Sequence, residues 1–565
     1  MSKQVKSFSS LPRNTDVFFF VGIPVVFVAT FLYPISQSGL SGDDIPNSMR
    51  SAALQANNWT RWKFITHAIK HWKTSEGRFF PMSTIENVFM FDFIHSVAIF
   101  KFLQLSVTII LLVLAAVVIA KLVDSKKLFP LAMFLLLSCL QTRNWYDPTL
   151  GFGLLLQSVQ IKFLACLYLL NCFLKAKERK WLWSLGCSTA LWHVALLQYE
   201  VVVTLFPTLV IMIIFLPSAR WRKLTAFAAL GVPTMVYLLY VSRLRAGVSA
   251  TAAYSINSDF SEVALTYLKQ ISGGLPFSAS IWSRGAMPLL STISDFPLPL
   301  LFIVTSMVCL TVFYRSEIAG LKTHHMIIVF AIGLNLVFGP PLTTALSLRW
   351  QNEVQWGLSY LSVAFTYTGM AFVALSILFV FSKLCMNRPK VFTAVFTLFL
   401  VFFTLSAVSN QALLSSNVRA TQDSREQRDL YELAIRQDFF SMVPDRSVVV
   451  YPSYDENSWV NTYFTEWLGG PKELVFVKAA EDAQGRCTTN VLFEKCPRIF
   501  HLNYLSSSYT SFVLSLVELD AQPLDSQLIR SFFGNLLHAE ELKPLCYGPI
   551  KQDTTNSMVY SCDKR

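Results

Sequence analysis

Residues 17–48 read VFFFVGIPVVFVATFLYPISQSGLSGDDIPNS, and this stretch holds the two features from which the rest of the chain is interpreted. Its first part, 17–35, is an apolar run of the length that crosses a bilayer as a helix, roughly 17–25 residues. No small-residue cleavage site follows it, which predicts a retained anchor rather than a removed signal peptide. About eight residues further on come Asp43 and Asp44, an acidic pair close to the predicted membrane surface.

The composition predicts an all-α polytopic membrane protein. Of 565 residues, 53% are hydrophobic and only 15% are charged, and the mean hydropathy is +0.47. A soluble domain carries roughly a quarter charged residues. The third predicted span is short and precedes Asp147-Pro148, so we expect it to be tilted or partly re-entrant. Eleven spans are expected, near 17–35, 101–120, 128–141, 153–174, 181–197, 201–217, 224–241, 296–314, 326–346, 358–382 and 391–408.

Positive charge in the short loops sets the expected orientation of these spans. With the N-terminus in the cytoplasm, the inner segments together carry 18 lysines and arginines, whereas the short outer loops carry only Arg143 and Arg349. This asymmetry predicts a cytoplasmic N-terminus and a C-terminus on the outer side. The formal charge of +12 is then mainly a consequence of topology and gives no reason to expect nucleic-acid binding.

The C-terminal segment changes character after the last span and predicts an extracytoplasmic domain at 409–565, following a transmembrane domain at 1–408. A charged helical pattern and short apolar runs, separated by Pro, Gly, Asn and Asp, indicate a small α/β domain. Four cysteines in it suit an oxidising compartment. Three pairings are possible, and proximity favours Cys487–Cys496 and Cys546–Cys562. Phosphate-loop and nucleophile-elbow motifs are absent, so the domain is expected to bind or cover a substrate.

Polar residues gather in the predicted outer loops. A carboxylate can act as a general base, arginines suit a phosphate leaving group, and aromatic rings stack on sugars. In the long first outer loop, 36–100, the pattern of residues 59–73 is typical of an amphipathic helix in the membrane interface. The candidate site residues are Asp43, Asp44 and Arg78 in the first outer loop, Arg143, Tyr146 and Asp147 in the second, Glu200 in the third, Arg284 in the fourth and Arg349 in the fifth.

Each candidate also has a structural interpretation. An Asp-Asp pair is commonly a turn or helix cap, and Asp147-Pro148 is a common start of a turn. Glu200 can cap the following helix at its N-terminus. Arg349 and Glu353, four residues apart, can form one exposed ion pair. The position of Asp43 and Asp44, after the first span and on the outer side, favours a functional role for that pair.

At these residues the chain resembles the GT-C superfamily of polytopic glycosyltransferases, which use polyprenyl-phosphate sugars as donors. The sequence Gly-Asp-Asp-Ile-Pro-Asn-Ser, followed by Gly77-Arg78-Phe79-Phe80-Pro81, is similar to bacterial inner-membrane proteins that modify O-antigen, lipopolysaccharide or other surface glycans. The resemblance implies that a hexosyl residue is transferred, with inversion, to a glycan or lipid-linked acceptor at the periplasmic face.

The resemblance also suggests residue roles. One of Asp43 and Asp44 would be the catalytic base, with Asp44 preferred, and Asp147 would assist the acceptor or a metal. A divalent cation, Mg²⁺ or Mn²⁺, would bind to Asp43, Asp44 and Asp147 if one is used. Two alternatives remain open: a polymerase or ligase of lipid-diphosphate-linked oligosaccharides, and a lipid-sugar flippase or transporter. Transporters usually show paired halves and charges near the midplane, and this sequence shows neither.

Overall fold

The structure is a computed structural model of the whole chain. Within residues 18–436 it describes everything except 49, 51–53, 55–57, 95, 144–145, 177–180, 249–254, 257–258, 285–317, 319 and 386. Beyond residue 436 it describes only strands. The chain divides into two compact units. The first comprises Met1–Asp44, Ile65–Met90 and Ile94–Ala420, and the second comprises Ile45–Phe64, Phe91–Phe93 and Thr421–Arg565.

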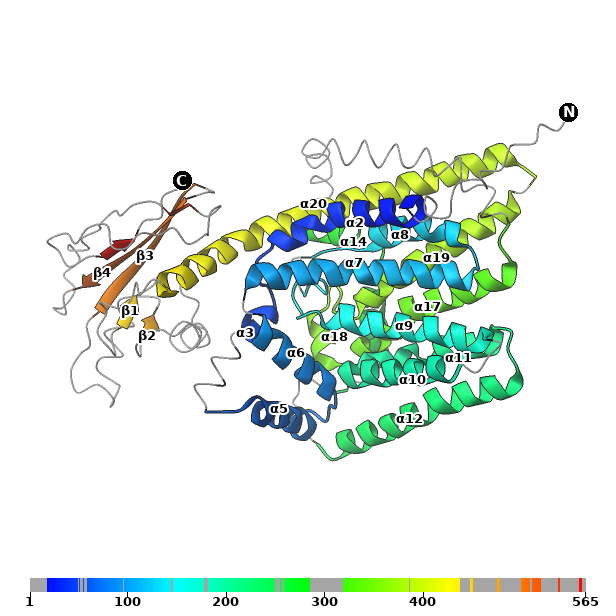
Figure 1. Ribbon diagram of the computed structural model, residues 1–565, viewed down its shortest axis with the longest axis horizontal. Helices are drawn as coiled ribbons and strands as arrows, with labels where there is room; N and C mark the ends of the chain where they lie inside the picture. The colour runs from blue at the N-terminus through cyan, green and yellow to red at the C-terminus, as the bar shows by residue number, and fades with distance from the viewer. Residues whose placement is uncertain are drawn as a thin grey trace. The chain divides into compact units, whose positions relative to one another are not determined.

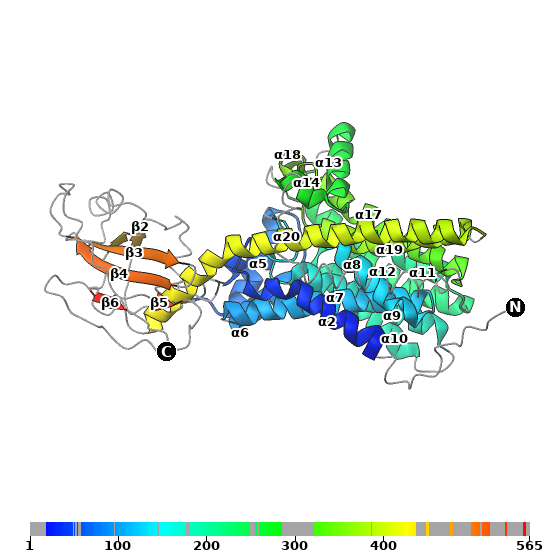
Figure 2. The same ribbon diagram turned by 90° about the horizontal axis from the view of Figure 1, so that it is seen from above.

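The first unit is a bundle of long apolar helices that pack side by side (Figures 1 and 2). Helical segments occupy every predicted span except 296–314, which lies outside the described residues. Their bounds are η1 (Phe18–Gly22), α2 (Ile23–Leu32), η2 (Tyr33–Gln37), α7 (Val97–Leu122), α8 (Phe129–Cys139), α9 (Leu155–Lys175), α10 (Trp181–Gln198), η4 (Glu200–Leu205), α11 (Phe206–Phe215), α12 (Arg220–Ala246), α17 (Thr323–Ala345), α19 (Val363–Leu384) and α20 (Pro389–Arg436).

Seven helices in the described part of the chain are long and apolar enough to cross a membrane. The third predicted span is α8, whose 11 residues are fewer than the roughly 20 that a perpendicular crossing needs. The chain is therefore a polytopic membrane protein. The last span extends further than predicted, because α20 continues without a break past residue 408, where the sequence predicts the domain boundary.

Helices α17 and α19 approach each other closely. At Gly369 an added Cβ atom would lie 2.7 Å from the Leu336 Cβ and 2.8 Å from the Gly333 carbonyl oxygen. Real side chains do not approach so closely, so the absence of a side chain lets the two backbones meet, as is common between membrane helices.

The predicted outer loops meet at one end of the helix bundle. Short helices belong to these loops: α3 (Asp44–Ser48), α5 (Arg61–Ser75) and α6 (Pro81–Phe93) to the first, α13 (Phe260–Ser272) and α14 (Ser278–Arg284) to the fourth, and α18 (Leu348–Glu353) to the fifth. Contacts between different loops include Asp43 with Gly151, Arg78 with Glu200, and Arg349 with Tyr146. Residues of the predicted outer loops thus contact one another, and the side of the membrane that they face stays a prediction.

Helix α5 coincides with the predicted amphipathic segment. Its Ile65 is buried, whereas Trp62, His67 and Lys70 are exposed. That α5 lies in a membrane interface stays a prediction.

The described residues beyond α20 form one sheet of six strands. The strands are β1 (Val448–Val450), β2 (Val475–Val477), β3 (Ile499–Ser508), β4 (Ser511–Leu519), β5 (Leu537–His538) and β6 (Met558–Tyr560). The order is β2-β1-β3-β4-β5, with β6 also paired to β4. Strand β1 is parallel to β2 and β3, whereas β3 and β4 are antiparallel. Any helices on this sheet and both predicted disulfides lie outside the described residues, so the α/β class stays a prediction.

Candidate functional site

The acidic pair belongs to a turn that interlocks with the loop between α8 and α9. The Asp43 backbone N–H donates to the Gly151 carbonyl oxygen at 2.9 Å, and the Ser41 hydroxyl donates to the Leu150 carbonyl oxygen at 3.0 Å. Gly42 lies between them with φ +55°, a region that L-residues rarely adopt. A Cβ atom at Gly42 would lie 2.7 Å from the Gly151 oxygen. The turn therefore requires glycine at this position, both for its φ angle and for space.

Replacing Gly42 with Ala is expected to displace the acidic pair from the loop between α8 and α9. The added methyl group must push away the Gly151 carbonyl, and the positive φ adds strain of the order of 1 kcal/mol. We expect a lower unfolding temperature and a loss of the proposed activity. Gly186 is the matched control, because a Cβ atom there would meet nothing within 4 Å. An unchanged Gly42→Ala protein would contradict the described turn.

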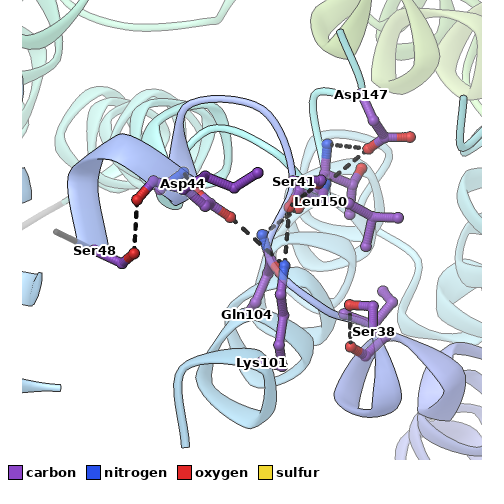
Figure 3. A network of polar contacts seen from close by, with 12 residues as sticks. Ser38, Ser41, Asp44, Ser48, Lys101, Gln104, Asp147 and Leu150 are labelled. Carbon is purple, nitrogen blue, oxygen red and sulfur yellow. Dashed lines mark hydrogen bonds and ion pairs between the residues drawn. The ribbon is translucent and has the colours of Figure 1, made fainter. Parts of the chain in front are cut away.

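The two aspartates face different surroundings. Asp43 is exposed, whereas Asp44 is fully buried at the start of α3. One carboxylate oxygen of Asp44 accepts a hydrogen bond from the Gly153 N–H, and the other lies 3.6 Å from the Lys101 ammonium. Figure 3 shows the Asp44 side chain directed at Lys101. Of the two aspartates, Asp43 is the one that is exposed to solvent.

Lys101 extends this network to the loop between α8 and α9. It lies on α7, is 0% exposed, and donates hydrogen bonds of 3.0 Å to the Gln104 side-chain oxygen and to the Leu150 carbonyl oxygen. The Gln104 amide donates in turn to the Thr149 carbonyl oxygen at 2.6 Å (Figure 3). A buried charge is costly unless it is paired and hydrogen-bonded, and here both conditions are met.

Burial raises the pKa of Asp44 from 3.8 to about 7, and the nearby Asp43 raises it as well, while Lys101 and the Gly153 N–H lower it. Between these two pH values the unfolded chain has released the proton and the folded chain retains it. The contribution of Asp44 to stability is therefore complete below about pH 4 and is lost as the pH rises through 7.

As the pH rises from about 5 to about 8, the free energy of unfolding of the wild-type protein should therefore decrease relative to that of the double variant Lys101→Met/Asp44→Asn. Thermal unfolding in detergent at several pH values measures this difference. A difference that is constant across the range would contradict a raised pKa at Asp44.

Asp147 and Arg143 hold the neighbouring loop in shape. The Asp147 carboxylate accepts hydrogen bonds from the backbone N–H groups of Arg143, Thr149 and Leu150. Burial raises the pKa of Asp147, and these donors lower it. The Arg143 guanidinium is 2% exposed and donates to the Tyr367 hydroxyl and the Ser359 carbonyl oxygen. Both side chains are thus committed to protein partners, and neither lines the cavity described next.

A cavity of about 200 Å³ opens beside these loops and contains charges of both signs. Arg78 donates a hydrogen bond of 2.8 Å to one carboxylate oxygen of Glu200, and an Arg245 nitrogen lies 3.6 Å from the same oxygen. The second oxygen of Glu200 is buried with no hydrogen-bond partner among the described residues. Glu76 also lines the cavity, and so does Tyr199, whose hydroxyl pKa is raised by burial. Two guanidinium groups therefore converge on one carboxylate.

Aromatic rings also line the cavity. Trp350 and Tyr360 both line it and stack with ring centroids 3.5 Å apart. Tyr146 packs edge-on against each of them, and its hydroxyl accepts a hydrogen bond of 3.1 Å from Arg349. Arg349 also pairs with Glu353, as the i,i+4 spacing predicts. Because Tyr146 also packs on Phe152, next to Gly151 and Gly153, these rings connect the cavity to the acidic turn.

The structure brings most of the predicted site residues into two adjoining groups, the acidic turn with its partner loop and the cavity. Arg284 ends α14, but its side chain lies outside the described residues. Glu76, Tyr237 and Tyr360, which line the cavity, and Lys101 were not predicted. Of these residues, only Lys101 could have been recognised as a candidate from the sequence, because it is a lysine at the first position of a predicted span. An ionisable residue at membrane depth is a reason to expect a site.

The three carboxylates that could bind a divalent cation do not form a metal site in this arrangement. Asp44 is directed at an ammonium group, and Asp147 accepts from three backbone N–H groups. Across the described residues there is no group of three His, Cys, Asp or Glu side chains that could hold a metal ion.

No protein-family model and no curated protein match the sequence. Among solved structures the chain is similar to ArnT from Cupriavidus metallidurans in the apo state, at 11% sequence identity. The similarity covers 86% of this chain and 93% of that one, with a TM-score of 0.41. A likeness at this level carries no argument about substrate or mechanism, which are therefore inferred from the site.

Proposed function

We propose that the protein is a membrane glycosyltransferase that transfers a sugar from a polyprenyl-phosphate donor to a glycan or lipid-linked acceptor. The observation that carries the proposal is the cavity lined by Arg78, Arg245 and the stacked Trp350 and Tyr360. Ring contacts of Tyr146 connect this cavity to Phe152, in the loop that holds the acidic turn. Guanidinium groups bind phosphate oxygens, and aromatic faces bind sugar rings. The acidic pair and the GT-C resemblance of its sequence support the same function.

In the proposed reaction, Asp43 accepts a proton from an acceptor hydroxyl. The hydroxyl oxygen bonds to the anomeric carbon of the donor sugar while the bond from that carbon to the phosphate oxygen breaks. A single displacement of this kind inverts the anomeric centre. Polyprenyl phosphate leaves, and its developing charge is stabilised by Arg78 and Arg245. The carbon–oxygen bond formed replaces the one broken, and the proton ends on Asp43.

The proposed location of this reaction is the outer, periplasmic face of a bacterial inner membrane. It follows from the charge asymmetry of the short loops, since the short outer loops, which carry only Arg143 and Arg349, contribute residues to the site. Helix α5 would lie at the membrane surface there, and the sheet that follows α20 would belong to a periplasmic domain.

The test supplies membranes containing the protein with a panel of radiolabelled undecaprenyl-phosphate hexoses and measures label in glycan and lipid fractions. Transfer from at least one donor, absent in membranes without the protein, is expected. If only an undecaprenyl-diphosphate oligosaccharide serves as donor, the protein is a polymerase or ligase and the proposal is wrong. Movement of label across the membrane without a new glycosidic bond would indicate a flippase instead.

A further inference from the structure

Lys101 is a buried charge for which the proposed reaction has no direct use. It lies on α7, one turn from the start of that helix, where the cost of burying an ammonium group is high. Its polar contacts include those to three separate parts of the chain: the Asp44 carboxylate, the Leu150 carbonyl oxygen and the Gln104 side chain on the same helix. None of these contacts faces the cavity, so Lys101 is not a phosphate ligand there.

Lys101 contacts both of the segments that are hydrogen-bonded to each other at the acidic turn. One side of the interlock is the backbone 41–44, and the other is 149–153. Asp44 joins the two directly through the Gly153 N–H, and Lys101 joins Asp44 to Leu150. The residue between these anchored points is Asp43, whose backbone is fixed to Gly151 while its side chain is exposed.

We propose that Lys101 is a positioning residue that acts through Asp44: the buried pair clamps the acidic turn to the loop between α8 and α9 and thereby fixes the exposed carboxylate of Asp43. This inference rests on the proposed function for the role of Asp43, whereas the clamp itself does not depend on it. In this arrangement the two aspartates divide the work. Asp43 contacts the substrate, and Asp44 holds Asp43 in place.

A neutral pair of residues would hold the acidic turn to the loop between α8 and α9 less firmly than Lys101 and Asp44 do. An ammonium group offers three donors and a charge. Lys101 donates hydrogen bonds to the Gln104 and Leu150 oxygens, and its charge lies 3.6 Å from an Asp44 carboxylate oxygen. Charge-assisted hydrogen bonds are roughly twice as strong as neutral ones. A general base must be held within hydrogen-bond reach of the proton it accepts, and a displacement of about 1 Å can cost about 10²-fold in rate.

The first test measures hydrogen exchange of the purified full-length protein in nanodiscs, for peptides covering 38–48 and 147–154. Lys101→Met is expected to raise exchange in both peptides by about 10-fold, because the hydrogen bonds between the segments open more often. Lys121→Met is the matched control, since Lys121 lies on the same helix but is exposed at the other end. Unchanged exchange in the Lys101→Met protein would overturn the clamp.

The second test measures transfer kinetics with the donor identified for the wild-type protein. Lys101→Met is expected to lower kcat by about 10- to 100-fold with a donor KM within about twofold of wild type, and Lys101→Arg is expected to restore part of the rate. The double variant Lys101→Met/Asp44→Asn should be no slower than the slower single variant, because both changes break one clamp. Fully additive losses, or a raised donor KM with unchanged kcat, would overturn the proposal.

Each test also has a fallback that keeps it decisive. If Lys101→Met does not accumulate, the double variant takes its place in the exchange measurement, since it buries no unpaired charge. If the wild-type protein transfers no sugar, the proposed function fails, while exchange still decides whether Lys101 clamps the turn.

Discussion

Replacing Asp43 with Asn is expected to lower the transfer rate by about 10²- to 10⁴-fold, the range that general-base catalysis typically contributes. Asn has nearly the same shape as Asp but cannot accept a proton from the acceptor hydroxyl. Asp43 is exposed, and its backbone N–H, which the change leaves intact, provides the bond to Gly151. We therefore expect normal protein levels and an unfolding temperature close to wild type. The measurement is single-turnover transfer in membranes adjusted to equal protein content.

Two further variants show whether the lower transfer rate of the Asp43→Asn protein results from the loss of a general base. Asp43→Glu keeps a carboxylate with a longer reach and should retain a measurable part of the rate. Glu262→Gln removes an exposed carboxylate from the first turn of α13 and should leave transfer unchanged. Wild-type transfer by the Asp43→Asn protein would remove Asp43 from the mechanism. If at the same time Asp44→Asn abolished transfer without opening the turn, Asp44 would be the base, as the sequence alone suggested.

Features of the fold that depend on local composition could be predicted from the sequence. Apolar runs locate the helices, because each span must satisfy its own backbone hydrogen bonds in lipid. Loop charge then assigns the loops to two sides, and this assignment predicts Arg78, Glu200, Tyr146 and Arg349 on the same face. The structure brings Arg78 into contact with Glu200, and Tyr146 into contact with Arg349. The end of the last helix was less predictable. Helix α20 continues past residue 408 into a charged segment where hydropathy no longer marks it.

The roles of individual polar residues depend on contacts between distant segments, which the sequence does not reveal. Arg143 and Arg78 are equally plausible phosphate ligands in sequence, yet Arg143 is buried against Tyr367 and Arg78 lines the cavity. Asp147 has the turn-capping role that its Asp-Pro context suggests. The two adjacent aspartates look alike in sequence, but Asp44 is buried and faces Lys101, 57 residues further along the chain, whereas Asp43 is exposed. Helix packing decides that difference, because Lys101 and the acidic turn belong to separate elements.

Opposite changes in donor affinity are expected when the two partners of the Arg78–Glu200 ion pair are neutralised one at a time. Arg78→Gln should raise the donor KM by about 10- to 100-fold, since a hydrogen bond to a charged group contributes about 1.5–3 kcal/mol. Glu200→Gln should lower it, because the Glu200 carboxylate occupies the guanidinium groups that a donor phosphate needs. Both side chains are partly exposed, so solvent screening reduces the effect of their pairing and the second change should be the smaller one.

The comparison of these two variants tests the function of the cavity more sharply than either alone. A structural ion pair loses stability when either partner is neutralised, and both variants would then show weaker donor binding together with lower unfolding temperatures. If the two arginines instead form a phosphate site that Glu200 occupies in the absence of donor, the donor KM should rise in one variant and fall in the other. Arg349→Gln provides the matched arginine control, since Arg349 pairs with Glu353 and Tyr146 and does not line the cavity. If Glu200→Gln instead raises the donor KM while stability is retained, Glu200 itself binds the sugar, and its unpartnered oxygen is the atom positioned to do so.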